Sequence, residues 1–193
     1  ARLKYKWGVR DVEDVSDAAH YIAGKGIVDK NRLIIKGSSA GGYTVLAALT
    51  FHNTFACGAS YYGISDLEAL FDDTHKFESR YTDLLVGSYP EQKQIYYDRS
   101  PIHFTDQLSC PVIFFQGMED RVVPPSQAEK MVAAIKDKGI AVSYVPFDNE
   151  QHGFRHASTI KTALDAELYF YAVIFGFKPA GRLLTIQIEN IDS

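Results

Sequence analysis

Hydrophobic and polar positions follow two periods along the chain, one typical of a helix and one typical of a buried strand. Apolar side chains recur every three or four positions from Val12 to Ile22, and the glycines that follow predict the end of a helix. Compact apolar runs predict four strands, at residues 32–36, 57–62, 112–116 and 142–147. Helical spacing predicts three more helices, at residues 40–50, 126–139 and 157–175. Because nearly wholly apolar strands alternate with helices, the pattern predicts an α/β domain with a parallel sheet covered on both faces.

Three segments carry signals beyond this alternation. Residues 66–108 contain two short helical patterns, near 67–72 and 78–86, and several aromatic residues. An excursion of this length between strands commonly supplies the lid or wall of a site, so we expect a lid-like segment here. Ser126-Gln127-Ala128-Glu129 has the spacing of a capping box, which predicts that a helix begins at Ser126. Residues 184–189 alternate apolar and polar side chains, which predicts a strand-like tail.

Composition and charge exclude several classes of protein. The 193 residues are 46% hydrophobic and 23% charged with a formal net charge of −4, which is typical of a folded domain without a nucleic-acid partner. The longest apolar stretch, at 169–177, is shorter than the roughly 18 residues that cross a membrane. The start of the chain lacks the apolar region of a signal peptide. We therefore expect one continuous domain over residues 1–193, cytoplasmic and without a membrane partner. Because the first residue is not Met, we also expect a longer parent chain.

Cysteine and histidine spacing gives no sign of a metal site. Cys57 and Cys110 lie beside apolar runs, and two thiols without a CxxC pattern form neither a zinc site nor a disulfide framework. We expect both to be buried free thiols. His152 and His156 are four positions apart, but no third ligand stands at a supporting spacing. The sequence therefore predicts no metal ion and no cofactor.

The segment Gly37-Ser38-Ser39-Ala40-Gly41 joins a predicted strand to a predicted helix, which is the context of a G-x-S-x-G nucleophile elbow. The sharp turn strains the serine backbone, and the positions two before and two after it are expected to need glycine. Ser38 lacks glycines at these distances, so Ser39 is the candidate nucleophile. The amide of Ala40, at the positive end of the following helix, is the candidate donor to a developing oxyanion.

A serine hydroxyl needs a base to take its proton and an acid to orient that base. In hydrolases of this kind the acid and then the histidine follow the serine, each in a loop after a strand. Asp120 follows the third predicted strand and His152 follows the fourth, and loops after parallel strands meet at one edge of a sheet. Taken singly, Asp120 as a helix cap or His152 as a surface side chain would be ordinary. Their order and placement together favour a Ser39–His152–Asp120 triad, with Glu119 and Asp148 as alternative acids.

Apolar residues near these loops are candidates for a pocket that receives the side chain before the cleaved bond. The candidates are Val122, Val123, Leu70, Phe71 and Phe77. Packing in the core explains each of them nearly as well.

Several motifs in series carry a resemblance to a known family. In chain order they are Trp7-Gly8, Asp11-Val12, the elbow, Glu78-Ser79-Arg80-Tyr81, Arg99-Ser100-Pro101, residues 117–124 and His152-Gly153-Phe154. With them the chain resembles the catalytic domain of the prolyl oligopeptidase family, in its acylaminoacyl-peptidase and dipeptidyl-aminopeptidase-like branch. The resemblance implies a serine peptidase of the α/β-hydrolase fold, which cleaves short peptides and carries a β-propeller upstream. It also implies that Ser39 is the nucleophile, Asp120 the orienting acid and His152 the general base, with Ala40 as one oxyanion donor.

The chain departs from this family in its extent. The catalytic domain of the family has eight strands, and this chain offers those that resemble the last four, so we expect a fold truncated to the later half of the parallel sheet. A second oxyanion donor has no counterpart here, and the loss of such a donor can cost about 10²–10³ in rate, so the chain alone is expected to be weakened or inactive. The strand before Ser39 would be an open apolar edge. We therefore expect a homo-oligomer or completion by missing upstream sequence, with the tail at 184–189 helping to cover exposed sheet.

The sequence supports one function hypothesis above two others. The first is a serine peptidase that hydrolyses short peptides, or acylated and N-terminal aminoacyl peptides, through an acyl-enzyme on Ser39. A carboxylesterase or lipase-like serine hydrolase would share the triad. A non-catalytic interaction fragment that merely retains the triad residues is the third reading.

Overall fold

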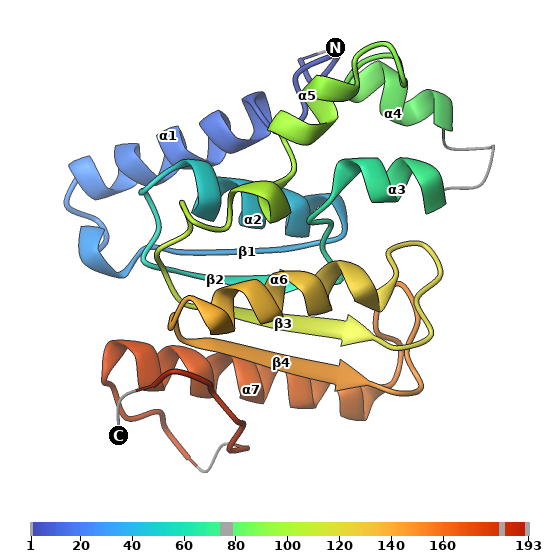
Figure 1. Ribbon diagram of the computed structural model, residues 1–193. Helices are drawn as coiled ribbons and strands as arrows, with labels where there is room; N and C mark the ends of the chain where they lie inside the picture. Colours follow the sequence, from blue (N-terminus) through green and yellow to red (C-terminus); the bar gives the residue numbers. More distant parts are fainter. Residues whose placement is uncertain (1, 74–78, 182–183, 192–193) are drawn as a thin grey trace.

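The fold is built around one parallel sheet. The computed structural model describes residues 2–73, 79–181 and 184–191 (Figure 1). The sheet has four strands in the order β1-β2-β3-β4, and every neighbouring pair is parallel. The strands are β1 (Ile34–Ser38), β2 (Cys57–Tyr61), β3 (Val112–Gly117) and β4 (Val142–Phe147). They occupy the four predicted segments, which confirms the α/β fold.

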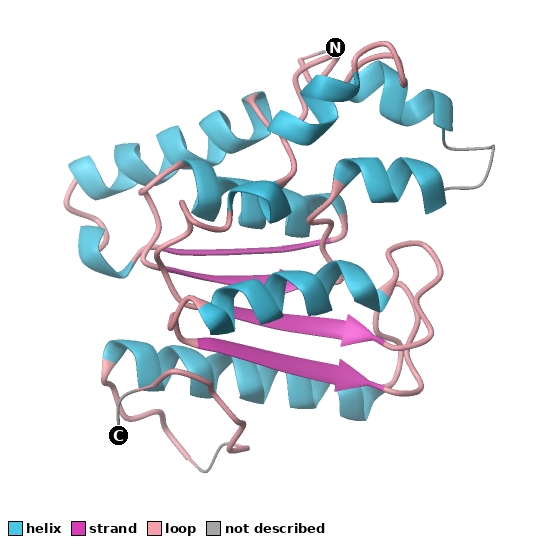
Figure 2. Ribbon diagram, in the orientation of Figure 1, coloured by secondary structure: helices cyan, strands magenta, loops and turns pink. Residues whose placement is uncertain are grey.

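Helices cover both faces of the sheet, as Figure 2 shows. The helices α1 (Arg10–Gly24), α2 (Ala40–Phe51) and α6 (Pro125–Asp137) lie on one face, and α7 (Ala157–Phe175) lies on the other. Alternate residues of β3 supply both cores, because Val112 and Phe114 pack with α2 and α6 while Ile113 and Phe115 pack with α7. A strand buried on both faces favours apolar residues, which explains the run from Val112 to Phe115.

The excursion at residues 66–108 packs against the α2 side of the molecule. It contains α3 (Leu67–Asp73), α4 (Ser79–Leu85), α5 (Lys93–Asp98) and a short 3₁₀ helix η2 (Pro101–Phe104); another 3₁₀ helix, η1 (Lys30–Arg32), precedes β1. The first two match the predicted helical patterns, whereas α5 and η2 were not predicted. Leu67, Tyr96 and Leu108 are buried in the same core as α2. A role as a lid stays a prediction.

The predicted start of α6 was wrong. The helix begins at Pro125 rather than Ser126, with Pro124 as its N-cap and no side-chain cap hydrogen bond. Proline fixes a backbone angle that suits the first helical turn, so the chain enters the helix earlier than the capping box implied.

The predicted strand at residues 184–189 was also wrong. Among residues 184–191 one antiparallel bridge joins Glu189 to Val142 of β4. The tail therefore lies at the β4 edge of the sheet, and it does not cover the edge of β1 on the other side. Within the described ranges, no helix is long and apolar enough to cross a membrane.

Candidate active site

The turn between β1 and α2 holds Ser39 in a strained conformation. Its φ is 54°, in a region that residues with side chains rarely adopt and that is common at functional sites. The turn is fixed on both sides, because Ser39 N–H donates to the carbonyl of Tyr61 at 2.9 Å and Tyr43 N–H donates to the carbonyl of Ser39 at 3.0 Å. The backbone therefore has the geometry that the G-x-S-x-G pattern predicts.

Three side chains from separate loops form one hydrogen-bonded chain. His152 Nε2 lies 2.7 Å from Ser39 Oγ, and His152 Nδ1 lies 2.8 Å from Asp120 Oδ2. The Asp120 side chain is fully buried, whereas the His152 side chain is 23% exposed. The other oxygen of Asp120 accepts the amides of Val122 and Val123, both at 2.9 Å. These bonds fix the carboxylate so that it faces the imidazole.

The alternative acids are not placed for this role. Glu119 and Asp148 are both exposed. Gln116, a buried residue of β3, donates from Nε2 to the carbonyls of Gly117 and Val123 at 3.1 Å and lies 3.5 Å from Asp120 Oδ2. Gln116 thus ties the turn that carries Asp120 to β3 by hydrogen bonds. Because Asp120 is buried and held in place while Glu119 and Asp148 are exposed, the geometry favours Asp120 as the acid.

Ala40 is the first residue of α2, directly after Ser39. The first amides of a helix have no partner within the helix and carry partial positive charge. Its N–H is therefore suited to an oxygen that becomes negative beside Ser39. Its role as an oxyanion donor stays a prediction.

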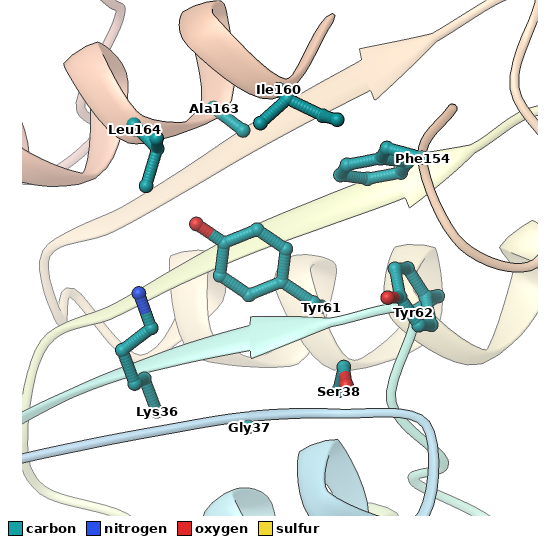
Figure 3. A pocket seen from close by; sticks show the side chains of 9 residues that line it. All are labelled: Lys36, Gly37, Ser38, Tyr61, Tyr62, Phe154, Ile160, Ala163 and Leu164. Atoms are coloured by element: carbon teal, nitrogen blue, oxygen red, sulfur yellow. The ribbon is translucent and has the colours of Figure 1, made fainter. Parts of the chain in front are cut away.

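A cavity of about 310 Å³ lies between β1, β2 and α7, beside the elbow (Figure 3). Tyr62 and Phe154 line it, and the ring of Tyr62 also lies 4.9 Å from the His152 ring, edge to face. Like Ser39, Tyr62 has a positive φ, of 38°. On the floor of the cavity Lys36 pairs with Glu167 at 2.9 Å, and Tyr61 donates to the same carboxylate. Burial raises the pKa of Tyr61, so its hydroxyl stays a donor.

A second cavity, of about 940 Å³, is lined by His152 itself and by residues of the loop that carries Asp120. Its lining includes Val122, Arg121 and Arg155. Glu119 and Asp120 line it as well, so the imidazole borders a cavity with apolar, cationic and acidic side chains.

The five predicted pocket residues are placed differently. Val122 is 44% exposed and lines the second cavity. Val123 and Leu70 are 1% and 7% exposed and belong to the core, so their apolar character serves packing. Phe71 packs against Tyr89 with ring centroids 4.3 Å apart. Phe77 lies outside the described residues.

Sequence analysis missed Tyr62 and Phe154 as site residues. Tyr62 directly follows β2 and Phe154 lies two positions after His152. Their positions after strands were the signal available, but that signal alone does not distinguish a cavity wall from the core.

The remaining candidates for metal or thiol chemistry lie apart. In the part of the chain that the structure describes, no three His, Cys, Asp or Glu side chains are grouped for a metal ion. His156 instead pairs with Glu150 through Nδ1 at 2.9 Å. Cys57 is buried and free as predicted, and burial raises its pKa. Cys110 is free but only half-buried, so the prediction that both thiols are buried was wrong for Cys110; its partial burial still raises its pKa to about 11.

A nucleophile elbow followed along the chain by an aspartate and then a histidine, each in a loop after a strand of a parallel sheet, is the arrangement of the α/β-hydrolase class. Within that class the chain belongs to the prolyl oligopeptidase family, whose sequence model matches residues 1–178. The family and fold predicted from the sequence are therefore confirmed.

Known relatives are much longer than this chain. A puromycin-hydrolyzing peptidase of Mycobacterium tuberculosis is 45% identical with a TM-score of 0.93, over 97% of this chain and 28% of that one. A puromycin hydrolase structure is 41% identical with a TM-score of 0.91, over 96% of this chain and 28% of that one. Dipeptidyl aminopeptidase BIII of Pseudoxanthomonas mexicana is 30% identical over 178 residues, which are 89% of this chain and 25% of the enzyme. The chain thus spans about a quarter of the length of these relatives.

Proposed function

We propose that this chain is the triad-bearing part of a serine peptidase. Its substrates are short peptides, or acylated and N-terminal aminoacyl peptides. The observation that carries the proposal is the continuous hydrogen-bonded chain from Ser39 Oγ through His152 to Asp120, with contacts of 2.7 and 2.8 Å. The names of the peptidases to which the chain is similar support it.

The reaction follows from the order of these contacts. Ser39 Oγ forms a bond to the scissile carbonyl carbon while His152 Nε2 takes the hydroxyl proton, and the carbonyl oxygen becomes negative near Ala40 N–H. The C–N bond then breaks as His152 gives its proton to the leaving amine. Water repeats the attack on the acyl-enzyme with His152 as the base, which releases the acid and restores Ser39. Asp120 stabilises the imidazolium throughout.

The solved structures suggest a substrate class. Puromycin joins an amino acid to an aminonucleoside through an amide bond, and two relatives are named for its hydrolysis. We therefore include amino-acid amides with a free amino group among the substrates. An esterase is the second candidate, because Esterase LipQ of Mycobacterium tuberculosis is 28% identical over 84% of this chain and 42% of that protein.

The test uses the complete protein and its Ser39→Ala variant. We expect hydrolysis of puromycin and of aminoacyl nitroanilides, and labelling by a fluorophosphonate, each abolished in Ser39→Ala. Turnover of p-nitrophenyl esters without turnover of the amides would favour the esterase. Absence of both turnover and labelling would refute a catalytic role and favour an interaction module.

A further inference from the structure

Glu150 is a buried carboxylate that no step of the proposed reaction uses. It lies two positions before His152 and is 2% exposed. Its oxygens accept hydrogen bonds from beyond His152, from Arg155 N–H at 2.9 Å, His156 N–H at 3.0 Å and His156 Nδ1 at 2.9 Å. The side chain therefore closes residues 150–156 into a loop that contains His152.

The surroundings of this carboxylate favour its ionised form. Burial alone would raise the pKa of Glu150, but hydrogen bonds from the amides of His156 and Arg155, together with side-chain hydrogen bonds from Thr159 and His156, outweigh it and hold the pKa at about 2. His156 is also the N-cap of α7, whose first turn carries partial positive charge. Hydrogen bonds to an ionised acceptor are stronger than neutral ones, so the loop is firmly closed.

The main chain of Glu150 also connects this loop to the neighbouring loop that carries Asp120. Its carbonyl accepts the N–H of Glu119 at 3.0 Å. The two loops approach closely, because a Cβ on Gly117 would lie only 2.5 Å from the Glu150 oxygen. Residue 150 is thus bonded to the start of α7 by its side chain and to the Asp120 loop by its carbonyl.

We propose that Glu150 is a positioning residue, which fixes the loop so that the His152 imidazole spans Asp120 and Ser39. The proposal rests on the proposed function and adds to it a residue outside the triad. If Glu150 only stabilised the start of α7, its loss would reduce the amount of folded protein but not the rate per active site. A positioning role predicts a lower rate per site, because a shift of about 1 Å at a reacting group can cost about 10²-fold.

The test is Glu150→Gln in the complete protein. Glutamine keeps the shape of the side chain but replaces one acceptor oxygen by an NH₂ group, which faces a backbone N–H and cannot accept from it. We expect kcat to fall by about 10²-fold while KM changes by less than about threefold. End-point titration with a fluorophosphonate counts the active sites, so kcat refers to folded molecules only. The control is Glu129→Gln, the same change on an exposed carboxylate of α6, which should leave kcat unchanged.

The outcomes separate the two proposals. An unchanged kcat per site in Glu150→Gln, with an active wild type, would overturn the positioning role and leave the peptidase proposal intact. If the wild type shows no Ser39-dependent reaction, the peptidase proposal fails, and a crystal structure of Glu150→Gln tests positioning alone. In the crystal structure of Glu150→Gln we expect His152 Nε2 to lie outside hydrogen-bond distance of Ser39 Oγ. A contact retained at 2.7 Å would overturn the positioning role of Glu150. Should Glu150→Gln not fold, Glu150→Asp, which keeps the charge on a shorter side chain, carries the same tests.

Discussion

The two glycines of the elbow motif differ in what they tolerate, and a pair of alanine variants tests this difference. A Cβ on Gly37 would lie 2.4 Å from the carbonyl oxygen and 2.6 Å from the carbonyl carbon of Gly41. A Cβ on Gly41 would meet no atom within 4 Å. The sequence motif predicts that both positions need glycine, whereas the structure gives a steric reason at Gly37 alone.

The cost of Gly37→Ala follows from the atoms involved. Real Cβ atoms essentially never approach closer than 3.0 Å, so β1 and α2 must separate by about 0.6 Å where they meet. Both contacting groups are backbone, which cannot rotate away, so we place the cost at the upper end of the range for overpacking, about 3 kcal/mol. For a domain of roughly 150–250 residues that unfolds cooperatively, a loss of about 3 kcal/mol in the free energy of unfolding lowers Tm by about 6–12 °C. Gly41→Ala should be neutral or stabilise α2 by up to about 1 kcal/mol, because alanine favours the helix.

The assay is thermal unfolding of both variants, together with fluorophosphonate labelling of Ser39. We expect Gly37→Ala to lose stability and labelling together, since the shift occurs two residues from the nucleophile. Gly41→Ala should match the wild type in both measurements. Equal damage from the two substitutions, or a harmless Gly37→Ala, would refute the steric reasoning.

Three further predictions concern a buried carboxylate, the two thiols and association. Because the pKa of Glu150 is lowered from 4.5 to about 2, its ionised carboxylate stabilises the fold above pH 4.5, and this stabilisation is lost as the pH falls to about 2. In urea titrations over this pH range, the Glu150→Gln variant should lack this loss of stability. Because Cys57 is buried and the pKa values of both thiols are raised, that of Cys110 to about 11, neither should react quickly with Ellman's reagent at about pH 8 before unfolding. Rapid labelling of Cys57 in the folded protein would contradict its burial. The outer edge of β1 has no strand partner in the described part of the chain, so the 193 residues produced alone should self-associate, and a monodisperse monomer in light scattering would count against this.

The sheet could be predicted from the sequence because burial on both faces leaves a direct signal. Every residue of β3 is buried, and the run from Val112 to Phe115 is wholly apolar. The helix α5 left no such signal, since of its six residues only Tyr96 is buried. The start of α6 was misplaced because Pro124 and Pro125 set the backbone before the capping pattern at Ser126 applies.

The triad residues could be selected from the sequence, whereas the cavity walls could not. Order along the chain and position after a strand single out Asp120 and His152, because parallel strands bring their following loops together. An apolar residue near such a loop gives no comparable information. Val122 and Val123 are adjacent, yet one is 44% exposed on a cavity and the other is buried in the core. Which of them faces the cavity depends on the turn that Asp120 makes with their amides.

Backbone hydrogen bonds continue the parallel ladder past the ends of the strands, and this explains why the three loops meet in register. The bonds run from Ser39 N–H to Tyr61 O, from Tyr62 N–H to Phe115 O, from Met118 N–H to Phe147 O and from Glu119 N–H to Glu150 O. They connect the elbow to β2, β2 to β3 and the Asp120 loop to the His152 loop in turn. Because each loop is bonded to its neighbour through main-chain atoms, the spacing of the triad is fixed by the register of the sheet before any triad side chain contributes. A change that slips one strand would therefore displace one member of the triad relative to the other two, even if all three side chains were intact.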